Sequence, residues 1–133
     1  MGRYLMRIFK TKWLVRFARR ERISDQSLSE AITRAEQGLV DADLGGGLIK
    51  QRVARAGQGR SGGYRMLVAY RSRNRAVFLY GFAKNELDNI EPDELLTLKD
   101  IAAGWLKAND KEILKALSED ALKEVKHGEE DKT

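Results

Sequence analysis

The run Leu48-Ile-Lys-Gln-Arg-Val-Ala-Arg55 is followed by a glycine-rich run, Ala56-Gly-Gln-Gly-Arg-Ser-Gly-Gly63, and then by two apolar segments, Tyr64 to Arg71 and Ala76 to Ala83. The apolar segments are rich in valine, tyrosine and phenylalanine, which favour the pleated surface of a sheet. A short polar turn at Ser72 to Asn74 separates them. The stretch therefore predicts three consecutive β-strands of an antiparallel sheet, the last two apolar on both faces and so central.

Helical periodicity on both sides of this stretch predicts helices. An apolar stripe that includes Trp13 and Phe17 predicts one helix from about Lys10, and Ser24 or Ser27 is expected to cap a second, whose buried stripe ends at Leu39. Pro92 suits the first turn of a third helix, with Ile101 in its buried stripe. A further helical pattern continues to Val125, with Ser118 as the cap of a last turn or short helix.

The remaining segments complete a fold prediction. Alternating residues from Arg3 to Ile8 predict a first strand, and Asp41 to Gly47 a loop. The predicted fold class is α+β: an antiparallel sheet of about four strands, with two N-terminal helices packed on it and C-terminal helices. At 133 residues the chain fits one domain, expected over residues 1–125, with a frayed polar tail at 126–133.

Charge divides the chain into two unequal parts. Residues 1–84 contain 18 lysines and arginines against 6 acidic residues, whereas residues 85–133 contain 7 against 14. All 14 arginines lie at or before Arg75. Because a guanidinium fork matches phosphate geometry, the first part indicates a nucleic-acid surface. A basic face that only improves solubility remains an alternative from composition alone.

Several function classes are excluded by composition. The chain has no cysteine, and its one histidine, His127, lies in the polar tail, so thiolate metal sites and histidine-based triads are not available. We expect no metal and no cofactor. There is no long apolar run for a membrane span and no apolar core of a secretory signal, so the expected compartment is the cytoplasm.

Basic residues gather on the predicted sheet. Ile49 and Val53 are expected on one face of the strand and Lys50 and Arg52 on the other, about 7 Å apart, a spacing that suits adjacent phosphates. An edge strand that uses cations against aggregation would give the same pattern. Further cations follow, and the candidate cluster is Lys50, Arg52, Arg60, Arg65 and Lys84, with Tyr64 and Tyr80 nearby.

Such a cluster suits RNA cleavage, because RNA carries its own nucleophile, the 2′-hydroxyl. The protein needs to align that group, accept its proton, stabilise the charged phosphorane and protonate the leaving 5′-oxygen. Arginines supply the charge stabilisation. A lysine crowded by other cations has its ammonium form disfavoured and can serve as the base.

Three motifs also carry a family resemblance: Lys50-Gln-Arg52 on a strand, Gly59-Arg-Ser-Gly-Gly-Tyr-Arg65 opening the next, and Phe82-Ala-Lys-Asn-Glu86 closing the last. Together with the order of elements and the run Ala116 to Leu122, they resemble the RelE/HigB-type toxins of bacterial toxin–antitoxin modules over residues 6 to about 125. The resemblance implies a RelE-like fold and a metal-independent ribonuclease that cuts messenger RNA in the ribosomal A site. Its implied partners are the messenger RNA, the ribosome and an antitoxin.

The resemblance also implies roles for single residues. Arg65 matches the arginine that stabilises the transition state. Lys50 and Arg52 match two basic residues on one strand, one of which is a candidate base. Lys84 matches the basic residue after the last strand. The implied RNA contacts are Arg55, Arg60, Ser61 and Tyr64. Two departures stand out: Asn85 replaces an arginine of the better-known members, and their C-terminal base-stacking tyrosine has no match at Ile90, Glu91 or Pro92.

Two alternatives remain open at this point. A ParE-like member with the same fold would poison DNA gyrase without cutting RNA. A non-catalytic module with a decayed site would bind RNA or an antitoxin only, with a steep salt dependence. The base preference, the way the antitoxin docks and the oligomeric state are not determined by the sequence.

Overall fold

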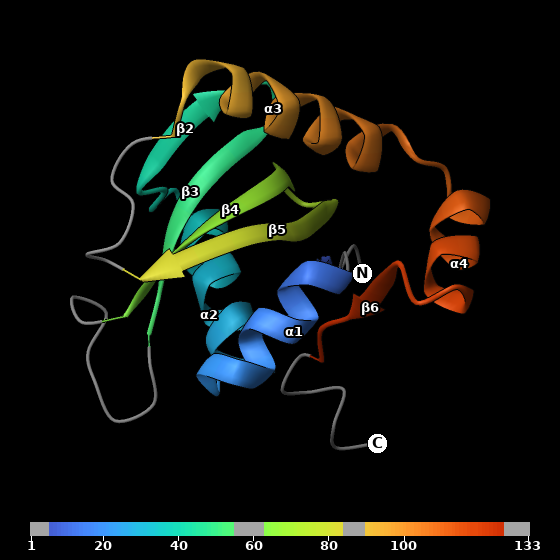
Figure 1. Ribbon diagram of the computed structural model, residues 1–133, viewed down its shortest axis with the longest axis horizontal. Coiled ribbons are helices and arrows are strands. Elements are labelled where there is room, and N and C mark those ends of the chain that lie inside the picture. Colours follow the sequence, from blue (N-terminus) through green and yellow to red (C-terminus); the bar gives the residue numbers. More distant parts are fainter. Residues whose placement is uncertain (1–5, 55–62, 84–89, 127–133) are drawn as a thin grey trace.

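The computed structural model describes residues 6–54, 63–83 and 90–126, which form a mixed α/β fold with four helices and one six-stranded sheet (Figure 1). The strand order across the sheet is β2-β3-β4-β5-β1-β6. The strands are β1 (Arg7–Thr11), β2 (Ala42–Gly45), β3 (Leu48–Val53), β4 (Tyr64–Arg71), β5 (Arg75–Ala83) and β6 (Leu122–Glu124). The helices are α1 (Lys12–Glu21), α2 (Asp25–Glu36), α3 (Pro92–Lys107) and α4 (Asp110–Ser118).

The predicted meander is confirmed at the centre of the sheet. Strands β3, β4 and β5 pair antiparallel, and the backbone N–H of Asn74 donates to the carbonyl of Arg71 to close the last turn. However, β1 lies beside β5 and is parallel to it, so the sheet is mixed rather than antiparallel. The sequence also missed two edge strands: β2 lies where a loop was predicted, and β6 where a helix was predicted.

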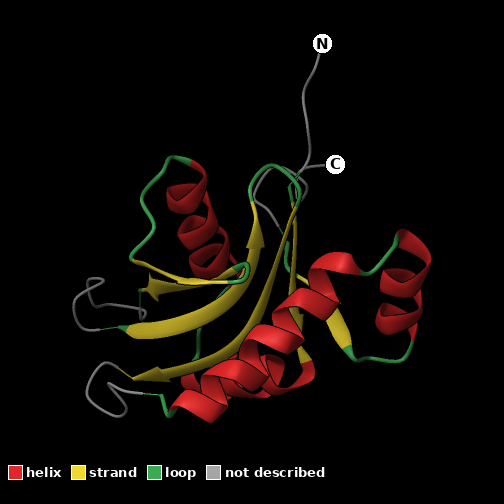
Figure 2. Cartoon of the chain, turned by 90° about the horizontal axis from the view of Figure 1, so that it is seen from above, coloured by secondary structure: helices red, strands yellow, loops and turns green. Residues whose placement is uncertain are grey.

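The sheet is covered on both faces (Figure 1). Helices α1 and α2 pack on one face over an apolar core that includes Leu14, Leu28 and Phe78. Helix α3 lies on the opposite face, in front of the strands in Figure 2, and its core includes Leu67 and Leu106. We call this second face the α3 face. None of the described helices is long and apolar enough to cross a membrane.

Local capping explains where the helices begin and end. The side chain of Ser24, rather than that of Ser27, caps α2 by accepting the backbone N–H of Ser27. Pro92 is the first residue of α3, as predicted. After α4 the chain reverses at Asp120, whose φ is 62°, and Val125 donates its backbone N–H to Ile8. The predicted helical continuation to Val125 was therefore wrong, because pairing with β1 competes successfully with local helix formation.

Three predicted core positions are more exposed than expected. Leu39 is 58% exposed because α2 has already ended at Glu36 and Gly38, with φ of 86°, redirects the chain. Ile101 is 42% exposed on the outer side of α3. Trp13 is 40% exposed and stacks on Phe17 at a ring distance of 5.1 Å, so it covers the core rather than lying inside it.

Candidate functional site

Three basic side chains from adjacent strands lie on the α3 face. Arg52 of β3 pairs in register with Arg65 of β4, and Lys50 pairs with Leu67, which belongs to the α3-side core. Residues two apart on a strand point to the same face, so Lys50, Arg52 and Arg65 share that face. Arg52 is exposed, whereas Lys50 and Arg65 are half-buried. We call these three residues the strand cations.

The strand cations have no acidic partner among the residues that the structure describes. Within residues 6–54, 63–83 and 90–126, no hydrogen bond or ion pair reaches any of their side chains, and Nη1 of Arg65 is buried without an acceptor. Leaving a buried donor unsatisfied costs about 1–3 kcal/mol. Phosphate oxygens are strong acceptors for such guanidinium groups. The arrangement is therefore suited to binding an anion such as an RNA phosphate.

A polar network that sequence reasoning missed holds the backbone of β3. Gln51 is fully buried on the opposite face, where its side-chain nitrogen donates to the carbonyl of Ala31 at 2.9 Å and its oxygen accepts the N–H of Asp41 at 2.7 Å. The carboxylate of Asp41 accepts the backbone N–H of Arg52 at 2.6 Å, and Arg34 donates to the carbonyl of Arg52. The only sequence signal was a glutamine at a core-facing strand position. This network fixes the segment that carries Lys50 and Arg52.

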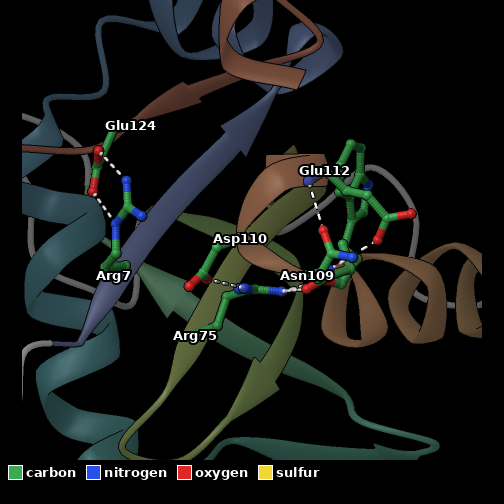
Figure 3. A network of polar contacts seen from close by, with 8 residues as sticks. Arg7, Arg75, Asn109, Asp110, Glu112 and Glu124 are labelled. Carbon is green, nitrogen blue, oxygen red and sulfur yellow. Dashed lines mark hydrogen bonds and ion pairs between the residues drawn. The ribbon is translucent and has the colours of Figure 1, made fainter. Parts of the chain in front are cut away.

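The other basic residues on strands β1 and β5 are arranged differently (Figure 3). Arg7 makes a two-pronged contact with Glu124, at 2.9 Å and 2.8 Å. The Nη1 group of Arg75 donates hydrogen bonds to the carbonyls of Trp105 and Ala108, at 2.8 Å and 2.7 Å. Its Nη2 lies 3.9 Å from the carboxylate of Asp110. Burial lowers the pKa of Arg75, and the charge of Asp110 opposes this shift. Arg75 therefore ties β5 to the corner between α3 and α4.

Lys10 of β1 is paired in the same manner. Its ammonium donates to Asp25 at 2.6 Å, and the other oxygen of Asp25 accepts the backbone N–H of Lys126 at 3.0 Å. Burial alone would raise the pKa of Asp25, but these two hydrogen bonds and the charges of Lys10 and Lys123 together lower it below 3.8. We call Arg7, Lys10 and Arg75 the paired cations, because each joins elements that are distant in the sequence.

Of the remaining predicted site residues, Tyr64 is the one that the structure describes, and it does not join this cluster. Tyr64 lies on the α1 and α2 face, 2% exposed, with its hydroxyl 2.6 Å from Glu21 and its ring edge-on to Phe17. Since Tyr64 precedes Arg65 on a strand, the two-residue alternation puts it on the other face. The predicted positions Arg55, Arg60, Ser61 and Lys84, and the departure at Asn85, lie outside the described residues.

A small cavity on the α3 face had no signal in the sequence. It measures about 290 Å³ and is lined by Tyr80, Ile90, Glu94, Thr97 and Leu98, between β5 and the first half of α3. Tyr80 pairs in register with Leu67, which in turn pairs with Lys50. The cavity and Lys50 are therefore on the same face of the sheet.

Comparisons with known proteins complete the description of the site. The described residues contain no group of three histidine, cysteine, aspartate or glutamate side chains placed to hold a metal ion. A search of the curated proteins found no match. A family model, described as the RelE toxin of the RelE/RelB toxin–antitoxin system, matches residues 6–125.

Proposed function

This chain belongs to the RelE toxin family, and we propose that it is a ribosome-dependent endoribonuclease that cuts messenger RNA in the ribosomal A site. The family match makes it the toxin of a toxin–antitoxin module, with an antitoxin as its partner. One observation supports the proposed activity most directly. The strand cations share one face, and within the described ranges they have no acidic partner and Nη1 of Arg65 is buried without an acceptor.

The proposed reaction uses the RNA's own 2′-hydroxyl. The 2′-oxygen attacks phosphorus, the bond from phosphorus to the 5′-oxygen breaks, and the products are a 2′,3′-cyclic phosphate and a 5′-hydroxyl. Arg65 and Arg52 would donate hydrogen bonds to the non-bridging oxygens as negative charge develops there. Guanidinium groups stay protonated in proteins, so Lys50 in its amine form is the member of the three that can accept the 2′-proton. Lys84, which the resemblance matches to the basic residue after the last strand, is the proposed donor of the proton to the leaving 5′-oxygen.

The test is primer extension on a message translated by purified ribosomes, with the wild type, Arg65→Ala and Arg71→Ala. Arg71 is a matched control, because it is an exposed arginine on the same strand, near the opposite end from Arg65. We expect cuts at A-site codons that require ribosomes. Arg65→Ala should cleave about 10²–10³-fold more slowly, the usual effect of removing one donor to the developing charge. Arg71→Ala should cut like the wild type.

Three outcomes would contradict the proposal. Cleavage that survives Arg65→Ala would remove Arg65 from the chemistry. Stalled translation on an intact message would show a protein that binds the ribosome without cutting. No effect on the message or on translation would instead direct the work to a gyrase supercoiling assay.

A further inference from the structure

The cavity on the α3 face has an aromatic wall, Tyr80, whose ring is held in place by its neighbours. The ring of Tyr80 lies 4.4 Å from that of Trp13 and 6.2 Å from that of Phe82, centroid to centroid. Tyr80 is half-buried, so part of it remains open to the cavity. Aromatic faces are the usual stacking surfaces for the bases of single-stranded nucleic acid. The aliphatic side chains of Ile90 and Leu98 complete an apolar slot.

The polar groups of the cavity lie on the first two turns of α3. Glu94 is the third residue of α3 and forms a capping box with Glu91, the residue before the helix. Its Oε1 accepts the backbone N–H of Glu91 at 3.1 Å, which fixes the carboxylate. Its Oε2 has no partner among the described residues. Thr97 donates its hydroxyl hydrogen to the carbonyl of Asp93 at 3.1 Å, so its oxygen can only accept a further bond. The cavity therefore offers hydrogen-bond acceptors beside an apolar slot.

We propose that this cavity binds one base of the RNA and selects a base that presents amino and ring N–H donors. Guanine suits it best, because its N1–H and N2 amino group are adjacent donors that a single carboxylate can accept. Uracil has one donor between two carbonyl acceptors, and the carbonyls would face the carboxylate. This inference rests on the proposed function for its ligand class, and it adds a specificity-determining residue, Glu94.

The distance between the cavity and the strand cations fits a single nucleotide. Tyr80 is two strands away from Lys50 in register, which corresponds to about 10 Å. That separation is comparable to the span from a phosphate to the far edge of its own base. A phosphate held by Lys50 and Arg52 can thus belong to the nucleotide whose base enters the cavity.

The chain supplies a matched pair of variants for the test. Glutamine can replace glutamate in a capping box, so Glu94→Gln should keep α3 intact while it adds an amide donor to the cavity. Glu112 holds the same position in the capping box of α4, where its Oε1 accepts the N–H of Asn109 at 2.8 Å, and it does not line this cavity. Glu112→Gln is therefore the control for the chemical change alone.

The experiment is a titration of purified protein with two 2′-O-methyl trinucleotides, one of guanine and one of uracil, followed by tryptophan fluorescence. These ligands cannot be cleaved, so binding is measured separately from catalysis. We expect the wild type and Glu112→Gln to prefer the guanine ligand about tenfold, the discrimination of one well-formed side-chain–base pair. Glu94→Gln should lose most of this preference.

Each other result has a defined meaning. Equal affinity for the two ligands in the wild type, no measurable binding of either, or a preference that persists in Glu94→Gln would overturn the inference. A guanine preference that depends on Glu94, in a protein that leaves translated messages intact, would support the cavity as a base site and refute the proposed nuclease activity. Failure of the base site and failure of the proposed nuclease activity therefore give different results.

Discussion

The strand cations and the paired cations are two groups of three basic residues on the same sheet, and they differ in what surrounds them. Arg7, Lys10 and Arg75 each meet a carboxylate, and Arg75 also meets two backbone carbonyls. Lys50, Arg52 and Arg65 meet no such partner in the described residues. The paired cations join the ends of the chain and the corner between α3 and α4. The strand cations join no other element in the described part of the chain, which is the arrangement expected of groups kept available for a ligand.

The contrast predicts opposite consequences for stability. A buried charge with its partners in place is destabilising to remove, because the partners are left unsatisfied. A buried donor without an acceptor already carries that penalty in the folded state, so its removal relieves the fold. Substitutions that leave the hydrocarbon stem in place separate these two cases most clearly.

The largest effect on stability is expected for Arg75→Met. Its side chain is 12% exposed, and the change would leave the carbonyls of Trp105 and Ala108 without their donor. We expect the free energy of unfolding to fall by about 2–3 kcal/mol in urea titrations, with an unchanged slope. The matched change Arg65→Met should leave it equal or slightly higher. Equal losses in both variants would erase the distinction between the two groups.

The next effect concerns Lys10 and its dependence on pH. The pKa of Asp25 is lowered in the folded state, so the stability it contributes is present above the unfolded value of 3.8 and is lost as the pH falls through the folded value. In Lys10→Met the opposing burial effect would raise that pKa. We expect a loss of about 1–2 kcal/mol at pH 7, which shrinks towards pH 3. Urea midpoints at pH 7 and pH 3 measure this loss of stability. A loss that is the same at both pH values would contradict the prediction.

Lys12→Met is the control for this measurement. Lys12 is exposed at the start of α1 and lies two residues from Lys10. Its substitution should change neither the urea midpoint at pH 7 nor the dependence on pH.

A smaller effect is expected for the salt dependence of RNA binding. Each phosphate contact that is lost should reduce the slope of log K against log salt by about 0.7 for a single strand. Arg52→Ala should show this reduction with an oligonucleotide in a fluorescence titration. Arg7→Ala should keep the wild-type slope, because Glu124 already neutralises Arg7. A change of slope in Arg7→Ala would show that the RNA path extends over the paired cations.

The smallest effect is expected for the stability of Arg7→Ala. The Arg7 and Glu124 side chains are 47% and 39% exposed, and exposed ion pairs contribute less than about 1 kcal/mol. Thermal unfolding at low and high salt would measure it, since salt screens what remains. A loss of stability as large as that of Arg75→Met would show that the exposed fraction of a paired cation does not determine its contribution to the free energy of unfolding.

The central sheet and the helices could be predicted because their patterns are strong and local. The apolar strands β4 and β5 and the start of α3 at Pro92 follow from neighbouring residues, which also limited the cap of α2 to Ser24 or Ser27. Strands β2 and β6 have only four and three residues, and they are strands because a partner strand lies beside them. The parallel pairing of β1 with β5 has no local signal either, since it depends on how the chain between these two strands folds.

The candidate site divides in the same way. Alternation along β3 placed Lys50 and Arg52 on one face, and the same rule could have placed Tyr64 on the other. The partner of Arg75 could not be predicted, because Asp110 is distant in the sequence. The cavity at Tyr80 and Glu94 depends on how α3 lies across β5, which only the tertiary structure defines. Local patterns thus show which side chains share a face, and packing decides which of them keep a free charge.

The position of β6 has a consequence for how the protein is made. Arg7 and Glu124, which contact each other across the β1 and β6 strands, are 117 residues apart. At about 5–20 residues per second, the ribosome needs roughly 6 to 23 s to produce the intervening chain. During that time β1 can pair with β5 when β5 has emerged, but its other side remains an open edge of the sheet. Among the described strands, β6 is synthesised last and covers this edge, so the described sheet is complete only after the ribosome has passed residue 124.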